Sequence, residues 1–252
     1  MYSVREIYKL SLETSYTFNL FDVFFYEFGL FMYIFLIIIP IYIFLISDIF
    51  IDKRIDTYIY SRINKKTNIW KNKIFLIFVV TVLYMVSAVF INIIIGGLSL
   101  GFPSEWSEAA VEINSVFSQE EFRYINTDFL NFSPLLATLV LISLLTLGLA
   151  FIGIIINLTT IILKKPIISL ALGMSINFIL LICFKYDDYI DIQILPHQHF
   201  LLIFKDVSLN IMNFNSIIFS YFYWLLTISV ATYISFFFFK KSNYIFEVKE
   251  YD

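Results

Sequence analysis

The sequence predicts an all-α integral membrane protein, a polytopic bundle of about five transmembrane helices. Apolar residues make up 60% of the 252 residues and charged residues only 15%, whereas a soluble domain has roughly 25% charged residues. Crossing a bilayer takes about 20 apolar residues, and a helix satisfies its own backbone hydrogen bonds in lipid. Five stretches without Asp, Glu, Lys or Arg are long enough for one span each: 28–47, 74–104, 129–163, 166–184 and 207–239.

Residues 1–252 are predicted to form a single transmembrane domain. Pro40 predicts a kink in the first span, because proline removes a backbone donor. Ser133 and Pro134 are suited to cap and open the third span. Residues 1–26 mix charged and apolar side chains near helical spacing, which favours an interfacial segment, although part of 15–28 could instead re-enter the membrane. The spans are expected at about 29–46, 74–95, 134–163, 167–184 and 217–239.

The segment 47–73 between the first two spans carries seven basic and three acidic residues, a net charge of +4. Basic loops stay on the cytoplasmic side of a membrane, so 47–73 is expected there. The loop 97–132, with six acids and one base, is then outside. The same alternation places Lys164–Lys165 inside, 185–206 outside and the C-terminus inside the cell membrane. Residues 1–26 fall outside. The basic residues of 47–73 are Lys53, Arg54, Arg62, Lys65, Lys66, Lys71 and Lys73.

The outer loop contains a stretch, 105–122, whose pattern predicts an extracellular amphipathic helix capped by Ser104. Trp106 lies on its apolar face, and Glu108 and Glu112 lie on its acidic face. One interpretation is a helix lying at the outer interface with Trp106 as anchor. The other is that Trp106, Glu108 and Glu112 form an outer gate or a surface that attracts cationic substrates.

The chain lacks the signature of an ATPase. With seven glycines, it has no Gly-x-x-x-x-Gly-Lys-Ser/Thr loop to bind phosphates. We therefore expect neither enzyme activity nor a cofactor bound directly by this chain. The net charge of −3 argues against a nucleic-acid partner. The bilayer itself is the one partner that composition implies.

Two polar clusters leave an enzymatic alternative open. His197 and His199, with Asp187, Asp188 and Asp191, have side chains suited to a transition metal, although histidines in a solvated outer loop would explain the same pattern. Glu120-Glu121-Phe122-Arg123 resembles the Glu-Glu-x-x-x-Arg motif of intramembrane prenyl-protein-type proteases. Its arginine is closer to the glutamates, and the motif lies in a loop. The alternative is a metal- or carboxylate-dependent intramembrane protease that uses Glu120, Glu121, His197 and His199.

The predicted spans contain amides but no deeply placed charge. Asn92, Asn157 and Asn177 are expected to form hydrogen bonds across helices. Ion-coupled transporters usually carry an ionisable group near the middle of the membrane. The pattern therefore favours a conduit driven by a soluble partner that acts on a cytoplasmic segment.

Three short polar signals resemble those of ATP-binding-cassette (ABC) type-2 transporter permeases. In the first, Asp48, Asp52, Lys53 and Arg54 match a polar turn, Tyr58, Ile59 and Tyr60 a short helix, Ser61 and Arg62 the turn after it, and Lys73 the lysine at span entry. The second is LPHQHFL at 195–201, and the third is the final span with its basic end, YWLLTISVATYISFFFFKKSNY at 223–244. Together they cover most of 29–245.

The resemblance implies a six-span fold whose first span is reduced here to residues 1–26. It also implies a homodimer or heterodimer with a second permease and a separate ABC ATPase that hydrolyses ATP. The substrate would be hydrophobic or a peptide. Small permeases of this kind are tied to peptide or bacteriocin export and immunity, so a non-transporting immunity protein is a further alternative. The residues expected to contact the ATPase are Asp52, Arg54, Ile55, Tyr58, Ile59, Tyr60 and Arg62.

Overall fold

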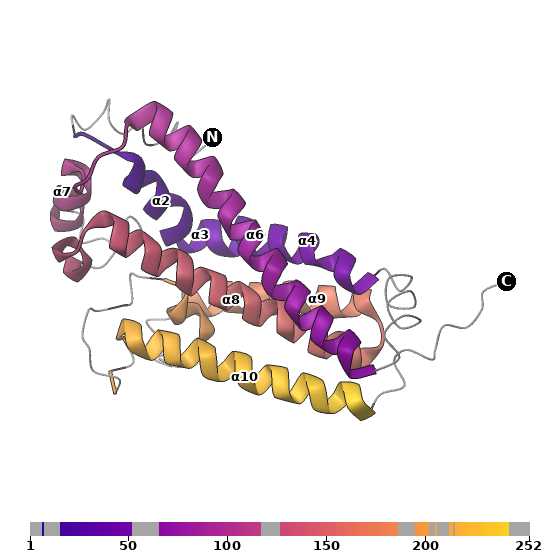
Figure 1. Cartoon of the computed structure of the whole chain (residues 1–252). Helices are drawn as coiled ribbons and strands as arrows, with labels where there is room; N and C mark the ends of the chain where they lie inside the picture. Colours follow the sequence, from indigo (N-terminus) through magenta and orange to yellow (C-terminus); the bar gives the residue numbers. More distant parts are fainter. Residues whose placement is uncertain are drawn as a thin grey trace.

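The computed structural model describes residues 7, 16–51, 66–116, 127–185, 195–201, 205, 212–213 and 215–241, and they form a bundle of long helices (Figure 1). Four helices are long and apolar enough to cross a membrane, and a bent helix pair can supply a fifth span. This agrees with the predicted all-α polytopic fold. The four helices are α6 (Lys66–Leu100), α8 (Pro134–Leu163), α9 (Pro166–Lys185) and α10 (Ile217–Lys241), and the pair begins with α2 (Leu20–Gly29).

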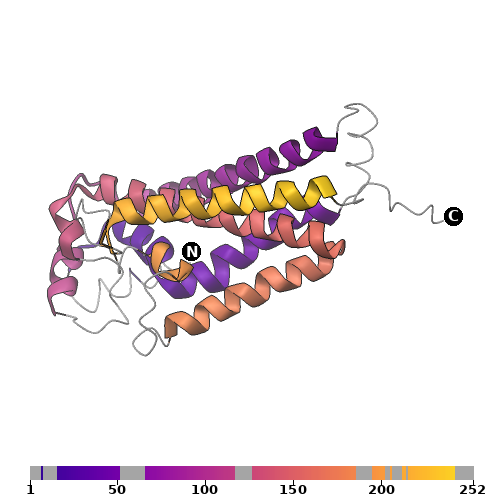
Figure 2. The same cartoon turned by 90° about the horizontal axis from the view of Figure 1, so that it is seen from below.

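Helix α8 lies at the centre of the bundle. In the most apolar 18-residue stretch of α8, 56% is buried inside the bundle. The corresponding share is at most 28% in the other three long helices. It contacts α2, α4, α6, α9 and α10, and Figure 2 shows α9 and α10 running beside it. The Ser133 hydroxyl accepts a hydrogen bond from the N–H of Leu136 at 3.4 Å, and Pro134 occupies the first turn. The predicted start of this helix is confirmed in detail.

Two glycines let neighbouring segments reach the backbone of α8. A Cβ atom at Gly148 would lie 2.1 Å from the Phe200 ring. A Cβ atom at Gly153 would lie 2.6 Å from the Tyr42 hydroxyl. Both distances are far shorter than any real carbon contact, so a side chain at either position would push α8 away from the residue that packs there.

The first span is broken rather than straight. Helix α2 is followed by α3 (Phe31–Tyr33), the π-helical segment η1 (Ile34–Ile38) and α4 (Ile39–Ile51). The two parts meet at 61°, where Leu30 has an extended backbone with ψ 126°. Val23 and Phe25 of α2 are fully buried in the core. Residues 20–26 of the expected interfacial segment thus belong to α2 and pack into the core, while its interfacial position and the alternative of re-entry at 15–28 both stay predictions.

Asp22 is a buried charged residue of α2. Its charge made a span through this stretch look costly, yet Asp22 is only 2% exposed in the structure. The carboxylate accepts hydrogen bonds from the N–H of Asn19 at 2.6 Å and from the Ser107 hydroxyl at 2.8 Å. The Asn19 side chain in turn accepts from the N–H of Phe21 at 2.9 Å. This capping box satisfies the buried charge.

The segment before Pro40 leaves one backbone carbonyl to be satisfied by another helix. In the π-helical pattern the N–H of Ile39 donates to the carbonyl of Ile34, so it is not available to Phe35. The next residue, Pro40, has no N–H. The Asn177 side chain of α9 donates to the Phe35 carbonyl at 2.6 Å. The expected irregularity at Pro40 is therefore a π-helical turn stabilised by a neighbouring helix.

The other two amides differ in their partners. Asn157 of α8 donates to the Ser235 hydroxyl of α10 at 3.1 Å, and the indole of Trp70 in α6 donates to the same hydroxyl at 3.0 Å. The Ser235 hydroxyl thus connects α6, α8 and α10. The bond that was expected from Asn157 across helices is formed. Asn92 instead donates to the Ala88 carbonyl of its own helix at 3.2 Å. Among the described residues, Asn92 forms no bond to another helix.

The basic segment 47–73 is shorter than predicted, because helices occupy both of its ends. Helix α4 continues to Ile51, and α6 begins at Lys66 rather than at about Ile74. Ile69 is 2% exposed and packs with Ile161 and Phe239. These contacts support the first turns of α6, which a count of charges alone assigned to a loop. Residues 52–65 join the two helices and lie outside the described residues.

The bond from Asn177 to Phe35 supplies a test of the broken span. We expect Asn177→Ala to lower the free energy of unfolding by about 1–2 kcal/mol, because the buried Phe35 carbonyl loses its donor. In a Pro40→Ala background the cost should be smaller, since residue 40 then has an N–H of its own. Denaturation of the four proteins in detergent, followed by tryptophan fluorescence, measures this coupling. Equal costs in both backgrounds would contradict the assignment.

Candidate functional site

The bundle has a basic end and an acidic end. The basic end is where α4, α8 and α10 finish and where α6 and α9 begin (Figure 1). The opposite end carries α7 (Glu108–Val116) and η3 (Thr127–Asn131). The described lysines of the basic end are Lys71, Lys73, Lys164, Lys165, Lys240 and Lys241. The described carboxylates of the acidic end include Glu105, Glu108, Glu112 and Asp128.

The residues expected to contact an ATPase belong to the segment that joins α4 to α6 at the basic end. Asp52, Arg54, Ile55, Tyr58, Ile59, Tyr60 and Arg62 all lie outside the described residues. The expected short helix at this position therefore stays a prediction. Its two anchors are described: Ile51 ends α4, and Lys66 begins α6.

At the acidic end, the predicted amphipathic helix is found but starts later. Helix α7 begins at Glu108, and the Ser107 hydroxyl accepts from the N–H of Ala110 at 2.9 Å. The cap is therefore Ser107 and not Ser104. The reason is the neighbouring α2, because Ser107 also donates to Asp22 and is held at this position. Trp106 precedes the helix instead of lying on its apolar face.

The three residues proposed as an outer gate hold α7 to its neighbours. The Trp106 indole donates to the Phe132 carbonyl at 2.7 Å, and its ring lies 5.2 Å from that of Phe25. Glu108 accepts a hydrogen bond from the Thr17 hydroxyl at 3.0 Å. Beside Glu112, the pKa of Tyr16 is raised, because its phenol donates a hydrogen bond to that negatively charged carboxylate. All three side chains thus contribute to one clamp between α7, α2 and the start of α8.

The two histidines are buried, which corrects the interpretation of a solvated loop. They belong to η5 (Pro196–His199), a 3₁₀ turn, and both are 0% exposed. The His199 ring stacks on Tyr223 at 4.0 Å, and the Trp224 indole donates to the His199 carbonyl at 3.2 Å. Apolar residues on both sides, Leu195 and Phe200–Leu201, were the sequence signal for this burial.

His199 forms a polar cluster with two residues of the neighbouring segments. Its Nδ1 atom lies 3.0 Å from the Ser220 hydroxyl and 3.3 Å from the Lys205 ammonium. An ammonium only donates, so Nδ1 accepts and a neutral ring carries its proton on Nε2. Burial, then the positive charge of Lys205 and then His197 lower the pKa of His199 to about 3. Within the described residues Nε2 has no hydrogen-bond partner.

The described residues contain no group of three His, Cys, Asp or Glu side chains that could hold a metal. The acidic partners considered for such a site, Asp187, Asp188 and Asp191, lie outside the described residues. So do Glu120, Glu121 and Arg123 of the protease-like motif. Burial around His199 instead favours a neutral ring that packs the first turns of α10 against η5.

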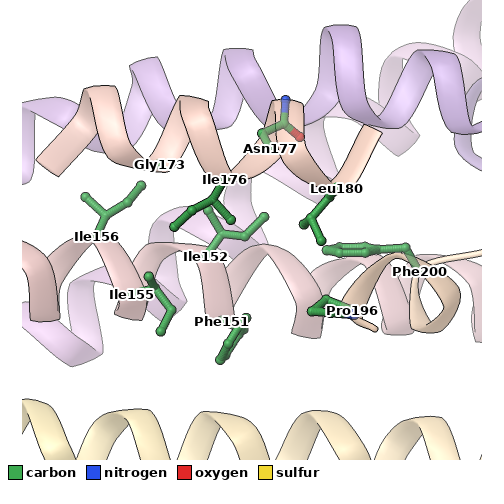
Figure 3. A pocket seen from close by; sticks show the side chains of 10 residues that line it. All are labelled: Phe151, Ile152, Ile155, Ile156, Gly173, Ile176, Asn177, Leu180, Pro196 and Phe200. Carbon is green, nitrogen blue, oxygen red and sulfur yellow. The ribbon is translucent and has the colours of Figure 1, made fainter. Parts of the chain in front are cut away.

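An apolar cavity lies beside η5, between α8 and α9 (Figure 3). Its volume is about 60 Å³. Phe200 and Pro196 lie at one end of it, and Asn177 is its one polar lining residue. Such a lining suits an apolar chain rather than a charged solute. The lining residues are Phe151, Ile152, Ile155, Ile156, Gly173, Ile176, Asn177, Leu180, Pro196 and Phe200.

Comparison with protein-family models, with curated proteins and with solved structures finds no match to this chain. The function of the chain is therefore inferred from its sequence pattern and from the geometry of its helices.

The low pKa of His199 predicts how stability depends on pH. Between pH 6.5 and 3 the unfolded chain binds a proton at His199, whereas the folded chain does not. Stability is therefore complete above pH 6.5 and is lost as the pH falls, by about 1.4 kcal/mol per unit. We expect a loss of about 2 kcal/mol from this residue at pH 5.

The measurement is chemical denaturation in detergent at pH 7.5 and pH 5. His199→Gln keeps a polar side chain beside Ser220 and Lys205 but does not titrate. The variant should lose less stability than the wild type on acidification, and an identical loss in the two proteins would refute the assignment.

Proposed function

We propose that this chain is the permease subunit of an ATP-driven ABC exporter in the cell membrane. It couples a separate ATPase to export of a hydrophobic or peptide substrate. The observation that carries the proposal is α6, which runs unbroken for 35 residues from the basic segment to the acidic end. At 1.5 Å per residue such a helix is about 52 Å long. Force applied to 52–65 would reach the far end of the bundle through one rigid element.

Helix α6 is also attached to the part of the bundle that is least regular. The Tyr42 and Thr81 hydroxyls hydrogen-bond at 2.8 Å, and the Tyr84 hydroxyl donates to the Ile38 carbonyl at 3.0 Å. These bonds connect the middle of α6 to the first span on both sides of Pro40. A tilt of α6 would therefore move the broken span with it.

At the acidic end, α6 packs closely against α2 at Gly96. A Cβ atom at Gly96 would lie 2.7 Å from the Leu20 side chain. The far end of α6 thus packs against α2, and α2 is held by the clamp of Trp106, Glu108 and Glu112. Movement of α6 would be passed to this clamp, which gives the outer-gate residues a role in opening the acidic end.

The cavity between α8 and α9 supports the apolar class of substrate. Its wall is apolar except for Asn177, whose amide nitrogen is bound to the Phe35 carbonyl. The cavity and the broken span share this residue, so a movement of α4 would alter the cavity. A dimer with a second permease and two ATPase subunits completes the proposed exporter, with the basic segment and the C-terminus in the cytoplasm.

Charge reversal tests where the ATPase binds. Arg54→Glu with Arg62→Glu should abolish co-purification of a co-expressed ABC ATPase, because the net charge of residues 52–65 changes from +2 to −2. Lys164→Glu with Lys165→Glu changes charge at the same end, between α8 and α9, and should leave binding intact. Deletion of 55–64 removes most of residues 52–65, the segment proposed to bind the ATPase, without entering α6. If the ATPase still co-purifies with the deleted protein, the coupling mechanism is wrong.

Transmission through α6 is separable from docking. Three glycines inserted after Thr67 should leave the ATPase bound but interrupt the rigid connection. Spin labels at Leu98 and Leu135, both exposed on α6 and α8, report the distance across the acidic end. ATP should change this distance in the wild-type complex and not in the insertion variant. Protection of cells from a peptide without any ATPase would instead favour the immunity alternative.

A further inference from the structure

A groove runs along the bundle surface between α6 and α10, on a different face from the cavity between α8 and α9. It is a shallow groove of about 540 Å³, and Figure 2 shows the two helices side by side. The ring centroids of Trp70 and Phe236 lie 5.0 Å apart. The lining residues are Trp70, Lys71, Phe78, Ile228, Ser229, Thr232, Tyr233 and Phe236.

The groove begins at the basic end and leads toward the middle of the bundle. Along α6 it extends from Trp70 to Phe78, and along α10 from Phe236 to Ile228. Each stretch is about 12 Å long at 1.5 Å per residue. A groove of this length, parallel to helices that cross a membrane, has the direction and reach of the upper part of a lipid acyl chain.

Two of the four hydroxyl and indole donors on the groove wall, those of Trp70 and Ser229, form hydrogen bonds within the protein. The Trp70 indole donates to Ser235, and the Ser229 hydroxyl donates to the Leu225 carbonyl at 2.7 Å. The wall therefore presents mainly aromatic and aliphatic carbon. Lys71 is the charged residue among those that line it, and its side chain is exposed.

The end of the groove is strongly basic. Lys240 and Lys241 close α10 one turn beyond Phe236, and the Lys241 ammonium lies 4.1 Å above the Phe237 ring. Lysines at such a level lay their stems on apolar surface and keep the ammonium at the lipid headgroups. Positive charge beside a groove for an acyl chain is complementary to an anionic phospholipid and not to a zwitterionic one.

We propose that the α6–α10 groove is a binding site for an anionic phospholipid. One acyl chain lies between Trp70, Phe78 and Ile228, and the phosphate is held by Lys71 with Lys240, which follows Phe236 by one helical turn. This site is independent of the exporter proposal, because neither the ATPase nor the substrate takes part in it.

Native mass spectrometry of the full chain in non-ionic detergent tests the site. With equal amounts of phosphatidylglycerol and phosphatidylcholine, the wild type should retain phosphatidylglycerol. Replacing Lys71 and Lys240 by Gln should weaken its binding by about fivefold for each lysine removed. The matched control, Lys164→Gln with Lys165→Gln, has the same charge type at the same end but lies outside the groove, and should bind as the wild type does. Equal retention of the two lipids by the wild type would overturn the proposal.

A second variant separates the groove from general attraction to charge. Ser229→Phe fills the groove and leaves every lysine in place, so it should lose bound phosphatidylglycerol while its unfolding transition stays cooperative. Unchanged lipid binding in this variant would overturn the site. So would a wild-type dimer that Ser229→Phe converts to monomer without loss of lipid, since a second copy of the chain would then occupy the groove.

Discussion

The bundle depends on satisfying backbone carbonyls where its first span departs from a regular helix. In lipid an unpaired carbonyl costs several kcal/mol, and the turn before Pro40 leaves the Phe35 carbonyl without a donor from its own helix. Asn177 supplies that donor, which fixes α9 against α4. The Tyr84 hydroxyl adds a bond from α6 to the Ile38 carbonyl. One irregular turn therefore determines how three helices are placed around the central α8, and with them the shape of the cavity.

Local patterns predicted the regular helices and missed the features that require distant partners. The charge-free stretches and the Ser133–Pro134 start located α8, because a cap is a property of adjacent residues. The burial of Asp22 was not predictable in this way, since its partner Ser107 is far away in sequence. For the same reason the histidines of η5 appeared to be solvated until the contacts with Ser220 and Tyr223 were known. A charged or polar residue is predicted to lie at a surface when no hydrogen-bond partner for it is found in the adjacent sequence.

The candidate functional residues fall into two groups at opposite ends of the molecule. Trp106, Glu108 and Glu112 form a clamp at the acidic end, and the segment 52–65 joins two long helices at the basic end. Helix α6 is the physical connection between them, which gives the exporter proposal its mechanism. The basic end has a second role in the lipid proposal, because the lysines of α6 and α10 lie beside an apolar groove. The two roles use different basic residues, arginines of 52–65 for the ATPase and lysines of α6 and α10 for the lipid, and can be tested separately.

The proposed coupling requires that the basic and acidic ends lie on opposite sides of the membrane, with the basic end in the cytoplasm. Single cysteines at Ser104 and Lys241, in a Cys183→Ser background, report each end through a maleimide that does not cross membranes. The cysteine at position 104 should be labelled in intact cells, and the cysteine at 241 only after permeabilisation. Labelling of both positions in intact cells, or of position 241 alone, would contradict the arrangement on which the proposed coupling depends.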